Sequence, residues 1–192
     1  ADGRGIPTIK PWNIEMIKKK IELTKEANAF AVAMDIDAAG LPFLKNFTPP
    51  AGSKSVEQLR EIVKLLDVPF IVKGIMTPKA SAIVVSNHGG RVLDQCPATA
   101  EVLEDIVKAT NGSMKIFVDG GIRTGVDVLK ALALGADAVI MARPFVSSVY
   151  VGAGEAVKAF AEKLKSELED TMAMCGAYSL DDISRDMVSI FK

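Results

Sequence analysis

Short apolar runs alternate with amphipathic stretches along the chain, and this alternation constrains the fold more than any other feature. Each run is apolar on both faces, as the strands of a buried parallel sheet are. A chain that alternates such strands with helices forms a parallel α/β structure. The six predicted strands are residues 5–9, 29–35, 69–74, 81–87, 115–120 and 136–142.

Helical patterns fill the intervals between these runs. One helix is predicted to start after Ser55, which forms a capping box with Gln58. We also expect a long helix over roughly 153–174 and a shorter helix at the C-terminus. The apolar stripes are Ile14, Ile17 and Ile21; Val56, Leu59, Ile62, Val63 and Leu66; Leu103, Ile106 and Val107; and Val128, Leu129 and Leu132.

The positions of the polar residues favour a (β/α)8 barrel over an open doubly wound sheet. They stand at the C-terminal ends of separate runs, and barrel active sites are built from the ends of several strands. In an open sheet the chemistry would concentrate at one switch point. We therefore predict that residues 1–192 form a single barrel domain. The residues concerned are Asp35, Lys73, Ser86, Asn87, His88, Asp119 and Arg143.

This barrel is predicted to be incomplete, because a closed one needs eight strands in roughly 250 residues. The six runs correspond to strands 3 to 8, so we expect the chain to be part of a longer one. Only residues 75–80 separate the runs 69–74 and 81–87, whereas a parallel crossover needs about a dozen residues. Either a crossover helix between strands 5 and 6 is missing between Thr77 and Ser81, or a deletion has produced an antiparallel hairpin.

Charge and cysteine content exclude several classes of function. The formal net charge of −1 favours neither nucleic acid nor an anionic membrane as a partner. Cys96 and Cys175 are far apart and belong to no Cys/His cluster, so we expect no disulfide framework and no metal site. This cysteine usage fits a reducing cytoplasm. No apolar run reaches the length of a membrane-spanning helix, about 18 residues.

The single histidine, His88, stands at the end of a predicted strand and is followed by two glycines. With an unperturbed pKa of ~6.5, imidazole is suited to general-base catalysis at neutral pH. The glycines let a ligand approach the backbone closely. Asp35, at another strand end, is the candidate carboxylate to orient the ring. A structural histidine, and a helix cap or turn at Asp35, remain the alternatives.

Two cations accompany the histidine. The guanidinium fork of Arg91 suits a substrate carboxylate, although an ordinary surface cation is the alternative. Lys73 emerges from an apolar strand, and lysine is rarely buried without a partner. Schiff-base chemistry and stabilisation of an anionic cofactor ring are both open for this lysine.

Residues 119–125, DGGIRTG, precede a predicted helix that begins near Val126. Glycine-rich backbone amides, a helix N-terminus and an arginine together bind phosphate, with an ordinary turn as the alternative. Arg143 supplies a second cation after the last run. The two loops follow the last two strands, where barrels usually bind phosphate.

Five separated segments, in order, resemble the family of FMN-dependent α-hydroxy-acid dehydrogenases and oxidases, which includes glycolate oxidase, lactate oxidase and flavocytochrome b2. The similarity runs from about residue 5 to the C-terminus, and it covers the later two-thirds of the family's barrel. The segments are VKG at 72–74, SNHGGRVLD at 86–94, PATAEVL at 97–103, DGGIRTGVDVLKALALGA at 119–136 and ARP at 142–144.

The resemblance implies that FMN oxidises a small L-2-hydroxy acid to the 2-oxo acid. It implies that His88 takes the proton of the substrate hydroxyl, that Asp35 holds the imidazole, and that Arg91 binds the carboxylate. It also implies a homo-oligomer, often a tetramer in the family, and leaves the electron acceptor open. The implied cofactor contacts are Lys73 and Ser86 at the flavin ring, Asp119 at the ribityl chain, and Gly121, Arg123 and Arg143 at the phosphate, with Gly120 and Ala142 completing the set.

The chain departs from the family pattern around the substrate. Pro7 stands where the family carries a tyrosine, and residues 35–43 lack an arginine that many members place there. Ala33 and Ala142 replace a threonine and a glycine. Two alternatives therefore stay open, namely an FMN oxidoreductase with a different substrate and a non-catalytic flavin-binding protein.

Overall fold

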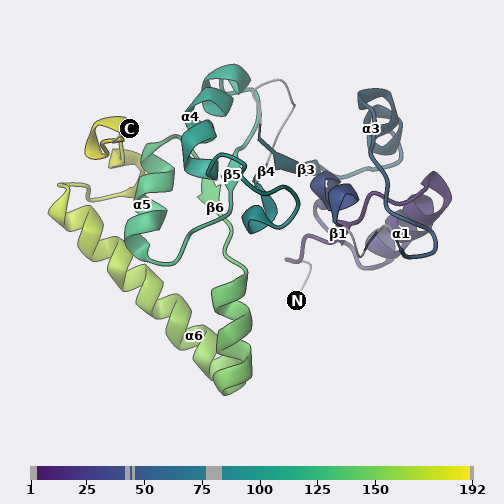
Figure 1. Cartoon of the computed structure of the whole chain (residues 1–192). Coiled ribbons are helices and arrows are strands. Elements are labelled where there is room, and N and C mark those ends of the chain that lie inside the picture. Colours follow the sequence, from purple (N-terminus) through teal and green to yellow (C-terminus); the bar gives the residue numbers. More distant parts are fainter. Residues whose placement is uncertain (1–3, 42–43, 45, 77–83, 191–192) are drawn as a thin grey trace. The chain divides into compact units, whose positions relative to one another are not determined.

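A computed structural model describes residues 4–41, 44, 46–76 and 84–190. These residues divide into two compact units, one ending at Cys96 and the other beginning at Pro97. Parallel strands and helices alternate in both, as Figure 1 shows, so the chain has the predicted α/β class. All six predicted strands are present, although four of them are only two residues long.

The first unit contains four parallel strands paired in chain order. They are β1 (Thr8–Ile9), β2 (Val32–Asp35), β3 (Phe70–Ile75) and β4 (Val84–Val85). Asp35 lies opposite Lys73 in the register of β2 and β3, and Lys73 lies opposite Val84 in that of β3 and β4. Since parallel strands end at the same edge of a sheet, this register gathers their last residues at one edge.

Two helices cover these strands, and local capping explains where each begins. Asn13 caps α1 (Ile14–Glu26), since its side chain accepts a hydrogen bond from the Met16 amide at 3.0 Å. The predicted capping box of α3 (Val56–Val63) is confirmed: the Ser55 amide donates to Gln58 at 2.9 Å, and the Gln58 amide donates back at 3.2 Å. The helices and strands bury one apolar cluster: Ile9, Ile17, Ile21, Val32, Met34 and Ile62.

The direction in which β3 and β4 pair distinguishes the two explanations of the short spacing between them. The strands are parallel, which excludes the alternative of an antiparallel hairpin. The place between Thr77 and Ser81 where a crossover helix was predicted to be missing lies outside the described residues. Because the pair is parallel, Lys73 and Ser86 lie at the same sheet edge, and the Lys73 ammonium donates to the Ser86 hydroxyl at 2.7 Å.

The second unit contains the parallel strands β5 (Phe117–Val118) and β6 (Ala138–Val139). The helices α4 (Thr99–Thr110) and α5 (Gly125–Ala133) match their predicted apolar stripes. Thr124 caps α5, and the helix therefore begins one residue before the expected start. The loops after β5 and β6 leave the same edge, because the two strands pair in parallel.

The C-terminal region differs from its prediction in two ways. Helix α6 (Arg143–Met174) starts ten residues early, and its backbone is non-helical at Gly152 and Ala153, so only its second part matches the predicted helix. Pro144 explains the early start, since proline is favoured in the first helical turn. The predicted short C-terminal helix is wrong, because two 3-10 turns occupy that region. They are Leu180–Asp182 and Arg185–Met187.

Candidate active site

His88 lies in a tight turn directly after β4. Its φ of +57° and the φ of +67° at Gly89 are left-handed, a conformation that glycine adopts without strain. Asn87 stabilises the turn by accepting a hydrogen bond from the Gly89 amide at 3.0 Å. The His88 amide donates to the buried Ser86 hydroxyl at 3.2 Å. The turn leaves the imidazole only 12% exposed.

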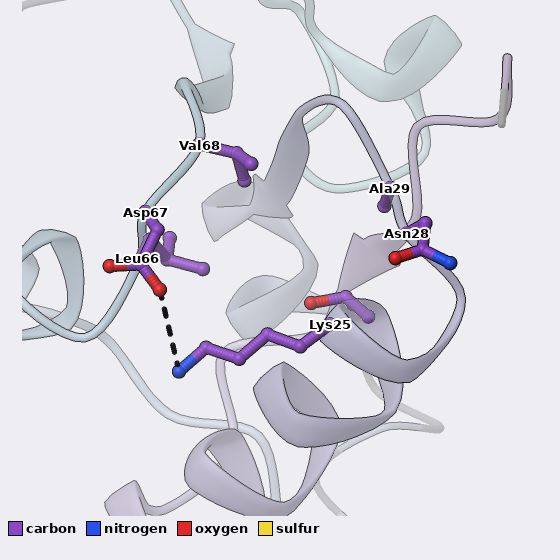
Figure 2. Close-up of a pocket in the computed structure, with 7 residues that line it drawn as sticks. Lys25, Asn28, Ala29, Leu66, Asp67 and Val68 are labelled. Atoms are coloured by element: carbon purple, nitrogen blue, oxygen red, sulfur yellow. Dashed lines mark ion pairs between the residues drawn. The ribbon is translucent and has the colours of Figure 1, made fainter.

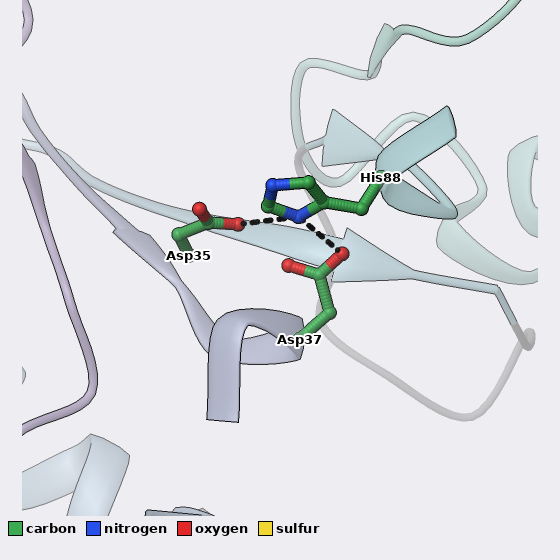
Figure 3. A group of neighbouring side chains, drawn as sticks. All are labelled: Asp35, Asp37 and His88. Carbon is green, nitrogen blue, oxygen red and sulfur yellow. Dashed lines mark hydrogen bonds and ion pairs between the residues drawn. The ribbon is translucent and has the colours of Figure 1, made fainter. Parts of the chain in front are cut away.

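Two carboxylates lie beside the same ring nitrogen of His88 (Figure 3). Nδ1 is 3.0 Å from Oδ2 of Asp37 and 3.6 Å from Oδ1 of Asp35. The hydrogen bond is therefore made with Asp37, whereas Asp35 lies within ion-pair distance. The prediction that Asp35 orients the ring stays a prediction, and the structure adds a second carboxylate that was not expected.

Asp37 comes from the 3-10 turn Ile36–Gly40 that follows β2. The sequence contained a usable signal, because a second aspartate stands two positions after a strand-end aspartate. It was missed because the direction of a side chain in such a turn depends on the turn geometry, which the residue pattern does not give.

Asp35 is buried and faces two ammonium groups. The Lys10 Nζ donates to its Oδ2 at 2.5 Å, and the Lys73 Nζ lies 3.5 Å from its Oδ1. Burial by itself raises the pKa of Asp35, but hydrogen bonds with Asp37 and Lys10 and the charge of Lys73 outweigh it and hold the pKa well below its ordinary value. Asp35 is therefore ionised at neutral pH.

Lys10 is the second residue of this cluster that the sequence analysis missed. It directly follows the apolar run 5–9, whereas Lys73 lies within the last two residues of its own run. The register of β1 and β2, in which Ile9 lies opposite Met34, brings Lys10 next to Asp35. The strand-end rule, by which polar residues at the C-terminal ends of the apolar runs are site candidates, would have found Lys10 if it had included the residue after each run.

The surroundings of His88 favour a neutral imidazole. Burial lowers its pKa below the ordinary 6.5, the positive charge of Lys73 lowers it further, Asp35 raises it, and Arg91 and Lys10 lower it again. Asp37 is hydrogen-bonded to Nδ1, and the ionised Asp35, which can only accept hydrogen bonds, lies on the same side of the ring. We therefore assign the proton of the neutral ring to Nδ1, which leaves the Nε2 lone pair available to a base.

Arg91 and Lys73 differ in accessibility. Arg91 is exposed, and its Nε donates to the His88 carbonyl oxygen at 3.0 Å, so the guanidinium is tied to the histidine turn. The Lys73 side chain is only 18% exposed. Asp35 and Ser86 hold its ammonium at the end of β3, a position suited to an anionic ring.

The predicted phosphate loop lies in the second unit, after β5. Gly120 and Gly121 have φ values of +89° and +84°, and a Cβ added to Gly121 would meet nothing within 4 Å. Thr99 fixes the loop by donating to the Asp119 carbonyl oxygen at 2.7 Å. A bare, open backbone of this kind fits the close approach of a phosphate-bearing cofactor.

The first amides of α5 are engaged within the protein. The Arg123 and Thr124 amides each donate to Asp127 at 3.0 Å, and the Gly125 amide donates to Glu167 at 2.9 Å. The helix N-terminus therefore contributes less to anion binding than the sequence pattern indicated. The exposed guanidinium groups of Arg123 and Arg143 remain suited to a phosphate, and Ala142 lies beside Arg143.

A separate pocket of about 310 Å³ lies in the first unit (Figure 2). Its residues come from the last turn of α1 and from the loops that lead into β2 and β3, at the edge opposite to Asp35 and Lys73. Its one ion pair joins Lys25 and Asp67 at 3.8 Å. Barrel enzymes place their chemistry at the other edge, so we assign this pocket no catalytic role. The lining residues are Thr24, Lys25, Asn28, Ala29, Leu66, Asp67 and Val68.

Asp35, Asp37 and His88 each offer a ligand atom within 4.8 Å of the others, which is close enough to hold a metal ion. The two ammonium groups beside Asp35, at 2.5 and 3.5 Å, disfavour a cation there and favour an acid–base cluster. Of the helices in the described part of the chain, none combines the length and apolarity needed to cross a membrane.

The chain is similar to flavin-dependent oxidases over most of its length. The family model described as FMN-dependent dehydrogenase matches residues 12–190. A peroxisomal (S)-2-hydroxyacid oxidase of Arabidopsis thaliana is 44% identical over 144 residues, which are 70% of this chain and 39% of that protein. An L-lactate oxidase of a Roseobacter species is 41% identical over 146 residues, which are 71% and 40% of the two chains.

Solved structures extend the similarity to the fold. A mandelate oxidase with (S)-4-hydroxymandelic acid matches with a TM-score of 0.84 and 26% identity, over 95% of this chain and 64% of the other. The chain thus spans about two fifths of the curated relatives' length. It corresponds to part of a (β/α)8 barrel, as predicted. With the match to the family model, this likeness shows that the chain belongs to the FMN-dependent dehydrogenase family of 2-hydroxy-acid oxidases.

Proposed function

We propose that the protein containing this chain oxidises a small (S)-2-hydroxy acid, the L form, to the 2-oxo acid. The observation that carries the proposal is the His88 imidazole, which hydrogen-bonds through Nδ1 to Asp37 and whose pKa is lowered by burial and by nearby positive charges. A neutral imidazole with Nε2 available is the base that removal of a hydroxyl proton requires. The names of the relatives support the substrate class.

In this proposal His88 accepts the proton of the substrate 2-hydroxyl at Nε2. The imidazolium that forms is stabilised by Asp35 and Asp37, whose oxygens lie 3.6 and 3.0 Å from Nδ1. General-base catalysis of this kind contributes typically about 10²–10⁴-fold to the rate. Bound FMN would supply the acceptor for the α-hydrogen and the two electrons that the substrate loses, and the exposed Arg91 binds the substrate carboxylate.

The cofactor contacts of each unit are also proposals. In the first unit, Lys73 and Ser86 form a hydrogen-bonded pair suited to a polar edge of the flavin ring. In the second unit, Asp119 would bind the ribityl chain. Gly120, Gly121, Arg123, Ala142 and Arg143 would bind the phosphate, because the loop backbone is open and the arginines are exposed.

A second candidate keeps FMN and the His88 base but takes a different substrate. Pro7 favours it, because this residue offers only a backbone carbonyl, which already accepts from the Ala33 amide at 2.9 Å. The family's tyrosine would offer a hydroxyl at that place. The turn Ile36–Gly40 likewise presents a carboxylate and no cation.

Anaerobic mixing of the flavin-loaded protein with paired (S)- and (R)-2-hydroxy acids tests the proposal. We expect the (S) acids to bleach the flavin absorbance and the (R) acids to leave it unchanged. Bleaching by none of the acids would favour the second candidate. A colourless protein that takes up no added FMN would contradict both candidates.

The electron acceptor, assembly and location extend the proposal. Oxygen consumption during turnover would identify an oxidase, whereas turnover only with an added dye would identify a dehydrogenase. We propose a homo-oligomer, for which sedimentation velocity should show a mass above that of one chain. We also propose a cytoplasmic location, which fits the free cysteines Cys96 and Cys175 and which cell fractionation would test.

A further inference from the structure

Asp35 and Asp37 both approach Nδ1 of His88, but their surroundings differ. Both oxygens of Asp35 face ammonium groups, with Lys10 2.5 Å from Oδ2 and Lys73 3.5 Å from Oδ1. Its Oδ1 is 3.6 Å from Nδ1, beyond hydrogen-bond distance. Asp35 therefore stabilises charge in the cluster without making the direct bond to the ring.

Asp37 makes that bond, and the fold provides a place for it. Its Oδ2 is 3.0 Å from Nδ1, and its side chain is only 11% exposed. The carboxylate packs against the bare backbone of Gly74 in β3, where an added Cβ would come within 2.5 Å of the Asp37 Cβ and Cγ. With a φ of +101°, Gly74 holds a conformation that residues with a side chain rarely adopt.

We propose that Asp37 is the positioning residue of the His88 base, holding the imidazole in the tautomer with its proton on Nδ1. The hydrogen bond fixes the ring orientation and directs the Nε2 lone pair away from the carboxylates. When Nε2 gains a proton, the Nδ1–H donor stays bonded to Asp37, so the imidazolium forms without a change in this contact. The inference rests on the proposed function for the use of Nε2, but the tautomer can be measured without turnover.

Because His88 is the single histidine of the sequence, its ring can be observed directly by NMR. Labelling the FMN-loaded protein with ¹⁵N-histidine reports the proton on each ring nitrogen through the nitrogen shifts and their couplings to the ring hydrogens. A His88→Gln variant identifies the signals by their disappearance. The variants to compare are Asp37→Ala, which removes the acceptor, and Asp37→Asn, whose amide oxygen can still accept. The matched control is Asp67→Ala, which removes a carboxylate with an 89% exposed side chain.

We expect the parent, Asp37→Asn and Asp67→Ala to keep the Nδ1–H tautomer at neutral pH, and Asp37→Ala to show a mixture of tautomers. Flavin reduction by the substrate should fall about 10–100-fold in Asp37→Ala, the range found when a partner that orients a metal-bound histidine is lost. An unchanged flavin spectrum would show that the cofactor is retained. If Asp37→Ala does not fold, Asp37→Leu fills the space without an acceptor and should give the same mixture.

An unchanged Nδ1–H tautomer in Asp37→Ala or Asp37→Leu would overturn the inference. An equal rate of flavin reduction in a folded Asp37→Ala protein would also overturn it. If none of the hydroxy acids reduces the parent flavin while the tautomer responds to Asp37, the proposed function fails and the positioning contact stands.

Discussion

At the residue scale, the surroundings of His88 predict how the proposed reaction depends on pH. Its pKa lies below 6.5, chiefly because burial and the charge of Lys73 disfavour the imidazolium. A base with a lowered pKa stays neutral to a lower pH than a free imidazole does, so anaerobic flavin reduction should rise with pH through a midpoint below 6.5. In Asp35→Asn the midpoint should move to lower pH, because the Asp35 charge raises the His88 pKa. A midpoint that moves upward would contradict the assigned electrostatics.

His88 itself should be needed for the chemistry and not for flavin retention. In His88→Ala, flavin reduction should slow by about 10²–10⁴-fold, the usual contribution of a general base. The visible spectrum of bound flavin should stay as in the parent. Equal reduction rates in the two proteins, measured by anaerobic stopped flow, would exclude the base assignment.

Lys10 should contribute to stability through the buried Asp35. Lys10→Met removes the donor 2.5 Å from Asp35 Oδ2 and leaves that oxygen poorly compensated, at a cost of about 1–3 kcal/mol in the free energy of unfolding. Lys25→Met is the matched control, because its partner Asp67 has an 89% exposed side chain and exposed pairs contribute about 0–1 kcal/mol. Urea unfolding of both variants at neutral pH measures the difference, and equal midpoints would contradict it.

At the element scale, the stability of strand β3 depends on Gly74, the residue before its last one. Gly74→Ala places a side chain at a φ of +101° and within 2.5 Å of Asp37, so about 1–3 kcal/mol of stability should be lost. Gly52→Ala, with nothing within 4 Å of the added Cβ, should change the unfolding midpoint little. The two midpoints in urea check this contrast. Comparable losses would show that the close approach of Asp37 to β3 is not required.

At the scale of the whole molecule, the proposed phosphate contacts of FMN lie in the second unit. Arg123→Met and Arg143→Met should each weaken FMN binding, because an exposed guanidinium that pairs with a phosphate is lost. Arg60→Met, an exposed arginine of α3, is the control. Quenching of flavin fluorescence on titration into the apoprotein measures the dissociation constants. Unchanged values in the variants of the second unit would remove them from the proposed phosphate site.

The order of the elements and three residues of the His88 cluster could be predicted, because both follow from local sequence. Apolar periodicity located the strands and helices, and the strand-end rule found Asp35, Lys73 and His88. The predictions failed where a side chain competes with the helix backbone. Asp182 accepts from the Tyr178 and Ser179 amides at 2.9 and 2.7 Å, and a 3-10 turn forms there where a helix was predicted.

The sequence by itself determined the fold class, the parallel alternation and the chemical types of the groups at the strand ends, because these follow from periodicity and composition. Only the tertiary structure decided which of those groups touch. The register of β1, β2 and β3 brings Lys10 and Lys73 to Asp35, and the turn after β2 brings Asp37 to His88. Such contacts join residues as far as 51 positions apart, and their geometry depends on backbone turns and strand register that no local pattern specifies.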